Sequence, residues 1–364
     1  MYLSPPDMSG REFEYVQQAF ATNWIAPFGP AIEGLKNEIK VQTGAAYTEP
    51  LNSGTSALHL ALITAGIKEE DVVFCPTFTF AASIFPVMYQ KAVPVFIDSE
   101  PQTWNMDPEL LEQAIKDAIK SGNKPKAIIL VHLYGFPAQI NKIVALAQKY
   151  RLILIEDAAE AVGSTYEGKH VGRFGLFGVL SFNGNKIITG GTGGAIITDD
   201  EVCYNHVCKL ANQAKEDKPF YVHNEVGYNY RLSNINAAIA LAQMEQLEDK
   251  IKKKKHIRST YKDLLQGYAE VKYSDIGSDN AWLTCILLPE KHDPETTRLA
   301  LEEYNIESRR LWNPMHQQPV FKYNKSYLNG ISDSLFQRGL CLPSGSSLQN
   351  EDLIHITDIV KSSL

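Results

Sequence analysis

Seven short apolar segments alternate with stretches of helical periodicity through the first two thirds of the chain, and this alternation limits the possible folds most. Several segments are nearly continuous runs of Val, Ile and Leu, which is typical of strands buried on both faces of a mainly parallel sheet. The pattern therefore predicts an α/β fold with a doubly wound, seven-stranded sheet. The predicted strands are 45–50, 72–75, 92–97, 127–132, 152–156, 177–182 and 194–198.

Helical patterns fit between these strands. A longer helical stretch begins after Ser233, where apolar residues recur at helical spacing. It runs into four consecutive lysines, 252–255, which are more readily interpreted as a solvated helix face than as an anion site because the chain is acidic. The helices predicted earlier in the chain are 54–66, 79–90, 107–121 and 138–150.

The last third of the chain predicts a second, smaller α/β unit. A strand is expected at 281–288, with helices at 294–304 and 351–362. No low-complexity tract or linker separates this unit from the rest of the chain. We therefore predict a large domain, 1–250, which also contains the N-terminal segment, and a small C-terminal domain, 251–364.

Composition and charge limit the classes of partner. Lys and Arg total 35 against 42 Asp and Glu, and this net charge of −7 argues against nucleic acid or an anionic membrane as a partner. No apolar run approaches the ~20 residues of a membrane span, and the first residues lack a signal-peptide pattern. Scattered cysteines indicate reduced thiols, so we expect a cytoplasmic protein. Cys203, His206 and Cys208 offer only three irregularly spaced ligands, so no metal site is expected.

A lysine and an aspartate that follow two buried strands suggest pyridoxal phosphate (PLP) chemistry. Lys186 follows the strand 177–182 and precedes the glycine cluster 190–194. A lysine amine forms a Schiff base with the PLP aldehyde, and a carboxylate such as Asp157 pairs with the pyridinium nitrogen. Asp157 ends a strand whose burial makes an unpaired carboxylate costly, whereas Glu156 would point to the opposite side. Taken singly, Lys186 would be better explained as a surface lysine, and Asp157 could be a salt-bridged structural residue; Ser181 and the flanking glycines favour the PLP interpretation.

Two further segments carry groups that suit an anion. Gly54, Thr55 and Ser56 open the first predicted helix, where free amides and hydroxyls attract a phosphate, although an ordinary helix cap has the same pattern. No Walker lysine follows Gly54, which favours the phosphate of PLP over that of a nucleotide. The segment 227–233 suits a phosphate or forms a capping loop. Phe80 could stack on a planar ring or belong to the core.

Together these motifs resemble the DegT–StrS group of nucleotide-sugar aminotransferases, which are PLP enzymes of the aspartate-aminotransferase fold (PLP fold type I). The resemblance implies that Lys186 forms the Schiff base and moves protons, and that Asp157 pairs with the pyridine nitrogen. Glu160 stands where many relatives carry Gln or His. The motifs lie at 23–27, 52–57, 76–80, 156–160, 181–194, 227–233 and 314–319. The implied cofactor-binding residues also include Gly54, Thr55, Ser56, Phe80, Ala159, Glu160, Ser181 and, from a second subunit, Asn229, and the implied substrate residues are Trp24, Arg231, Arg310 and His316.

The residues 183–186 look most like the branch that aminates C4 of UDP-linked 4-keto-6-deoxy sugars. The resemblance implies a UDP-linked N-acetylhexosamine as the acceptor, glutamate as the donor and a homodimer with shared active sites. It also implies a role in the synthesis of a surface polysaccharide or glycoprotein glycan. Arg309 and Arg310 could bind the pyrophosphate and Trp312 could stack on the sugar, although both arginines are equally well explained as surface residues. Alternatives are a sugar 3-aminotransferase, a sugar 3-dehydratase and a non-catalytic regulator on the same scaffold. The dehydratase is disfavoured because such relatives carry histidine where Lys186 stands.

Overall fold

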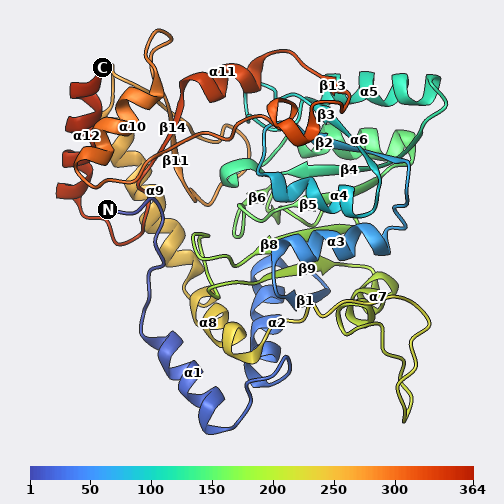
Figure 1. The fold of residues 1–364 in the computed structure, drawn as a ribbon. Helices are drawn as coiled ribbons and strands as arrows, with labels where there is room; N and C mark the ends of the chain where they lie inside the picture. Colours follow the sequence, from blue (N-terminus) through green and yellow to red (C-terminus); the bar gives the residue numbers. More distant parts are fainter.

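An eight-stranded sheet forms the centre of the computed structural model, which describes residues 1–364 (Figure 1). Its strand order is β1-β9-β8-β5-β4-β2-β3-β13. β9 runs antiparallel to β1 and β8, and the other neighbouring strands are parallel. The strands are β1 (Tyr47–Leu51), β2 (Asp71–Pro76), β3 (Val93–Ile97), β4 (Lys124–Val131), β5 (Ile153–Asp157), β8 (Phe177–Ser181), β9 (Gly194–Thr198) and β13 (Ser326–Tyr327).

The seven predicted strands are confirmed, and the eighth, β13, comes from a distant part of the chain. It pairs in parallel with β3, where Phe96 N donates to Lys325 O. Asp98, directly after β3, accepts three backbone N–H groups of the segment 329–332. β13 has only two residues, which is too short for a pattern of alternating apolar residues. Its pairing therefore depends on tertiary contacts, and the sequence did not predict it.

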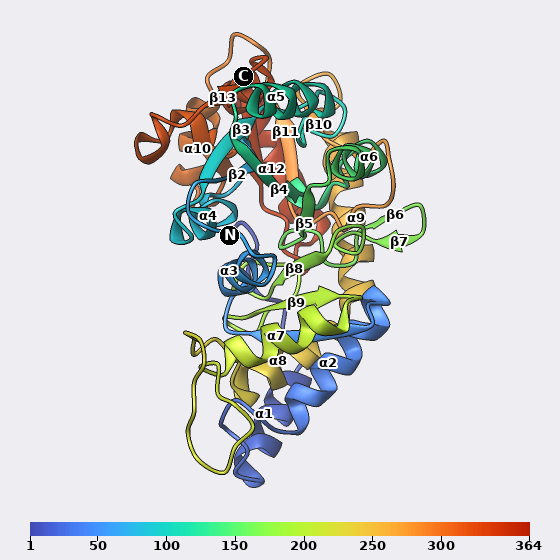
Figure 2. The same ribbon diagram turned by 90° about the vertical axis from the view of Figure 1, so that its right-hand side faces the viewer.

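Helices cover both sides of the sheet. Figure 2 shows α3 and α4 on one side and α6 on the other. The helix predicted at 79–90 is wrong in its continuity, since the segment forms a 3-10 turn, η1 (Ala81–Ser83), and a short helix, α4 (Phe85–Tyr89). Pro86 accounts for the break because it has no N–H and its ring clashes with the preceding turn. The other predicted helices are α3 (Gly54–Thr64), α5 (Pro108–Lys120) and α6 (Ile140–Tyr150), and α7 (Glu201–Ala211) follows β9.

The N-terminal helices pack on a helix from the middle of the chain. α1 (Arg11–Ala21) and α2 (Pro30–Thr43) both contact α8 (Asn234–Met244), at the lower end of the molecule in Figure 1. The helical stretch predicted after Ser233 is divided, because α8 ends at Met244 and α9 (Leu247–Leu264) begins after a short turn. α9 leads from this end of the molecule toward the smaller sheet (Figure 1).

A four-stranded antiparallel sheet forms the second unit, in the order β10-β11-β14-β12. This unit has its own hydrophobic core of 13 buried residues, all between Ile257 and Val360. The separate core supports a division near residue 250, which remains a proposal. The elements are β10 (Glu270–Val271), β11 (Thr284–Leu287), β12 (Arg309–Arg310), β14 (Gly339–Leu342), α10 (Pro294–Glu303), α11 (Ile331–Arg338) and α12 (Asn350–Ser363), and the hairpin β6 (Thr165–Tyr166) and β7 (Lys169–His170) lies apart from both sheets.

The run of lysines in α9 is only partly a solvated face. The side chain of Lys252 is 71% exposed, as predicted. Lys254 is buried, and its Nζ donates to Trp282 O at 3.1 Å and to Ser344 O at 2.6 Å. The prediction is therefore wrong for Lys254, because the side chain reaches carbonyl acceptors that local charge patterning does not reveal. None of the helices combines the length and apolar character needed to cross a membrane.

Candidate active site

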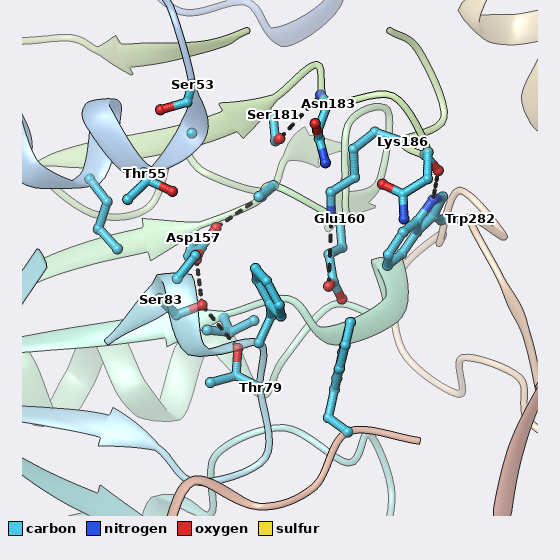
Figure 3. A pocket seen from close by; sticks show the side chains of 18 of the residues that line it. Ser53, Thr55, Thr79, Ser83, Asp157, Glu160, Ser181, Asn183, Lys186 and Trp282 are labelled. Carbon is cyan, nitrogen blue, oxygen red and sulfur yellow. Dashed lines mark hydrogen bonds and ion pairs between the residues drawn. The ribbon is translucent and has the colours of Figure 1, made fainter. Parts of the chain in front are cut away.

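A cavity of about 400 Å³ lies where several strands of the large sheet end. Val131 ends β4, Asp157 ends β5 and Ser181 ends β8, and all three line it. The carboxyl ends of parallel strands in an α/β sheet are the usual place for ligand sites. Eight predicted residues line this one cavity: Gly54, Thr55, Phe80, Asp157, Ala159, Glu160, Ser181 and Lys186 (Figure 3).

Asp157 is fixed at the base of the cavity by two hydrogen bonds. Its Oδ1 accepts the backbone N–H of Ala159 at 3.1 Å, and its Oδ2 accepts the Ser83 hydroxyl at 2.7 Å. Thr79 extends the chain, with 2.9 Å between its Oγ1 and Ser83 Oγ (Figure 3). Sequence reasoning missed Ser83, because a serine on a 3-10 turn carries no signal of its function. The bonds orient a buried carboxylate toward the cavity, where it can pair with a cationic N–H.

Glu156 points to the opposite side of β5, as predicted. Its oxygens accept three backbone N–H groups of the segment 172–175. His132 Nε2 lies 3.0 Å from Glu156 Oε2, and His132 Nδ1 accepts the N–H of Ala138. Burial alone would raise the pKa of Glu156, but these donors hold it below its ordinary value. The adjacent carboxylates of Glu156 and Asp157 therefore have separate roles. Glu156 is enclosed by protein donors, whereas Asp157 faces the cavity.

Lys186 enters the cavity from the loop after β8. Its Nζ lies 3.6 Å from Glu160 Oε1 and 4.0 Å from the centre of the Trp282 ring. Trp282 Nε1 donates to Asn185 O at 2.8 Å, which fixes the indole beside the lysine (Figure 3). Trp282 lies just before β11 of the smaller sheet, and nothing in the sequence indicated that it lies in the site. The lysine amine is thus held among a carboxylate, an aromatic face and open volume.

The start of α3 supplies donors for an anion. Ser53 is the N-cap, and its hydroxyl accepts the N–H of Ser56. Free amides, the Thr55 hydroxyl and the facing Ser181 line the cavity at this end. Gly54 lies so close to the opposite strands that a Cβ there would come within 3.2 Å of Ser181 Cβ. A helix N-terminus with hydroxyls around it is a suitable phosphate site.

Six predicted site residues do not line this cavity. The Ser56 hydroxyl donates to Asn52 Oδ1 at 2.6 Å instead. Asn229 is exposed, and Arg231 next to it is half-buried. Trp24 is 41% exposed. The sequence alone could not decide these positions, because none lies at a strand end of the large sheet.

Arg310 and His316 are also directed elsewhere. The Arg310 guanidinium lies 4.2 Å from the centre of the Phe336 ring and donates to Phe336 O at 3.0 Å. His316 Nδ1 lies 2.7 Å from Thr77 Oγ1, and its Nε2 lies 3.1 Å from Asp333. The cavity instead contains Arg309 together with Trp312, and the centre of the Trp312 ring is 5.2 Å from that of Phe80.

Two of the three residues weighed as metal ligands bind other groups. His206 Nε2 lies 3.0 Å from Glu225, and the Cys208 thiol donates to Glu49 at 3.4 Å. Cys203 is half-buried on the same helix, α7. No group of three or more His, Cys, Asp or Glu side chains is placed to hold a metal ion.

The donor set of the cavity fits PLP. A buried carboxylate can hold a ring N–H, a lysine can bond to an aldehyde, and a helix N-terminus can hold a phosphate. The model of the DegT/DnrJ/EryC1/StrS aminotransferase family matches residues 6–361. The chain belongs to this family.

Relatives of the DegT/DnrJ/EryC1/StrS family match over nearly their whole length. The chain is 44% identical to "Putative pyridoxal phosphate-dependent aminotransferase EpsN" of Bacillus subtilis (strain 168), over 99% of this chain and 95% of that protein. It is 40% identical to GDP-perosamine synthase of Escherichia coli O157:H7, over 98% and 96%. A solved DegT DnrJ EryC1 StrS aminotransferase from Brucella abortus has a TM-score of 0.91 and 30% identity, covering 97% of this chain and 95% of that one. The chain is a PLP-dependent nucleotide-sugar aminotransferase.

Proposed function

We propose that this aminotransferase moves an amino group from glutamate to C4 of a nucleotide-linked 4-keto-6-deoxy sugar. The product is a 4-amino sugar for a surface polysaccharide or glycoprotein glycan. The observation that carries the proposal is one cavity lined by Lys186 and Asp157 together with the exposed Phe80 and Arg309 and the half-buried Trp312. Aromatic faces suit the apolar face of a sugar ring, and an arginine suits a pyrophosphate.

Each residue of the cavity has a distinct task in this proposal. When bound, PLP supplies an aldehyde that takes up the amino group and a ring that accepts electrons. Lys186 provides the amine that anchors the aldehyde and moves a proton at the reacting carbon. Asp157 keeps a proton on the ring nitrogen, and Ser83 holds that carboxylate in place. Phe80 and Ala159 enclose the ring from its two faces.

The phosphate of the cofactor is assigned to the start of α3. The Thr55 and Ser181 hydroxyls and the free amides after Ser53 are its donors. Ser56 supports this end of the helix, since its hydroxyl and N–H both bond within the turn. For the pyrophosphate of the substrate, Arg309 is a better candidate than Arg310, because only Arg309 lines the cavity.

We further propose a homodimer in which each site includes residues of the other subunit. Asn229, Arg231 and Trp24 lie away from the cavity of their own chain and are wholly or partly exposed. In a shared site they reach the partner's phosphate and substrate. Lys186→Ala and Asn229→Ala should each be inactive, and a mixture of the two should regain activity because one site of the mixed dimer is intact. An inactive mixture with proven subunit exchange would exclude a shared site.

The nucleotide has two candidates. The residues 183–186 favour a UDP-linked N-acetylhexosamine. The relative at 40% identity, named GDP-perosamine synthase, favours a GDP-linked sugar. Purified enzyme should be given glutamate with matched UDP- and GDP-linked 4-keto sugars and a UDP-linked 3-keto sugar, with products identified by mass spectrometry. Amination of only the 3-keto sugar would replace the proposal with a 3-aminotransferase, and elimination without amination would indicate a dehydratase.

A further inference from the structure

Glu160 is the charged side chain closest to the reactive amine in this cavity. Its Oε1 lies 3.6 Å from Lys186 Nζ (Figure 3), and its Oε2 accepts the backbone N–H of Tyr134 at 2.6 Å. Only 6% of the Glu160 side chain is exposed. The carboxylate therefore has one oxygen bonded to the protein and the other oxygen directed at the lysine.

The surroundings hold Glu160 and Trp282 together around the lysine nitrogen. The buried Asn280 donates through Nδ2 to Glu160 O at 2.9 Å, and its Oδ1 accepts the N–H of Trp282 at 3.0 Å. Lys186 Nζ thus lies between a carboxylate and the face of an indole, and both stabilise a positive charge. A site that required only a neutral amine would need neither group.

We propose that Glu160 is the counter-charge of the Lys186 nitrogen: its carboxylate stabilises the cationic form of that nitrogen and accepts a proton from it. The exchange is balanced, because one proton leaves Nζ and binds Oε1, which gives a neutral nitrogen and a carboxylic acid. Glu160 would then act through Lys186 as a positioning and proton-storing residue. The inference rests on the proposed role of Lys186 as the lysine that bonds to PLP.

The other ionisable groups around Glu160 are one carboxylate, which repels it, and two groups that burial keeps neutral. Burial raises the pKa of Glu160, and the charge of Asp157 raises it further, whereas Lys186 and the Tyr134 N–H act in the opposite direction. Burial also raises the pKa values of the Tyr134 phenol and the Cys285 thiol well above their ordinary range, so both remain neutral near pH 7. The cation beside Glu160 is therefore the lysine nitrogen, 3.6 Å from its Oε1.

The test is a pH titration of the visible absorbance of PLP bound to the protein, without any sugar present. In Glu160→Gln the midpoint should fall by about one pH unit or more, because loss of a nearby negative charge disfavours the protonated, cationic form. Glu160→Asp keeps the negative charge but holds it farther from Lys186 Nζ, because its side chain is shorter. It should therefore lower the midpoint less than Glu160→Gln. Glu49→Gln is the matched control, since it breaks another buried Glu–Lys pair, with Lys36 at 2.8 Å, outside the cavity.

The outcomes separate this inference from the proposed function. An unchanged or raised midpoint in both Glu160 variants, or an equal fall in Glu49→Gln, would refute the role of Glu160. Borohydride reduction and peptide mapping of the wild-type protein test the lysine independently. A label on Lys186 with no shift in the Glu160 variants rejects only the counter-charge. A label on another lysine rejects the assignment of Lys186 itself.

Discussion

The burial of Lys254 in α9 leads us to predict how the free energy of unfolding depends on pH. Its Nζ has two carbonyl partners, Trp282 O and Ser344 O. A neutral amine has two N–H groups and matches them, whereas an ammonium has three and leaves one unpaired. Burial accordingly lowers the pKa of Lys254 to about 7. The folded protein therefore accommodates the neutral form of this side chain better than the charged form.

The sign of the effect follows from proton binding. In the unfolded chain the lysine has a pKa of about 10.4, so between pH 7 and pH 10 the unfolded state binds more protons than the folded state. The free energy of unfolding should then rise with pH. A pKa of about 7 in the folded state corresponds to a gain of about 2 kcal/mol between pH 7 and pH 9 from this one group.

Urea unfolding of the wild type and Lys254→Met at several pH values measures this gain. The variant loses hydrogen bonds, so its absolute stability should fall, but the pH-dependent part should disappear. The difference in unfolding free energy between the two proteins should change by about 2 kcal/mol from pH 7 to pH 9. Lys252→Met, which changes an exposed lysine of the same run, should keep the wild-type slope. Equal slopes for the wild type and Lys254→Met would show that Lys254 is charged in the folded protein.

Three further predictions concern the site and its support. Asp157→Asn should retain the fold but lose most turnover, since an amide cannot keep the ring nitrogen protonated; full activity with complete PLP occupancy would contradict this. Ser83→Ala removes a hydrogen bond to a charged group, worth about 1.5–3 kcal/mol, so PLP should be lost faster on dialysis. Gly135→Ala should lower the unfolding temperature markedly, because the residue has a φ of +89° and a Cβ would lie 2.0 Å from the buried Asn280 Oδ1. An unchanged unfolding temperature in Gly135→Ala would show that the segment around Gly135 can shift to make room for the added methyl group.

The sequence predicted the parts of the site that lie on the sheet itself. Asp157 and Ser181 end buried strands, and Gly54 opens a helix, so apolar periodicity places all three at one edge. The place of Trp282 in the site and the burial of Lys254 could not be predicted, because both depend on contacts between segments that are far apart in the chain. Local periodicity carries no information about contacts between residues that are far apart in the chain.

Residues assigned by resemblance gave a mixed result for the same reason. Lys186 and Glu160 lie in the cavity, whereas Asn229, Arg231 and Trp24 lie outside it. The resemblance indicated the type of each residue but not its distance from the cavity of its own chain. Arg309 and Arg310 show that the sequence also leaves the direction of a side chain undetermined. Neighbouring residues of a strand point to opposite faces, and the sequence alone did not fix which face meets the cavity.

The pairing of β13 with β3 has a consequence for synthesis on the ribosome. The hydrogen-bonding edge of β3 stays uncovered until its partner emerges, about 230 residues later. At a translation rate of about 5–20 residues per second, this delay lasts roughly 10–50 s. An uncovered strand edge is a template for pairing with other chains. Nascent chains that stall before Ser326 should therefore be the most aggregation-prone products of this gene, and chaperones that shield strand edges should matter most in that interval.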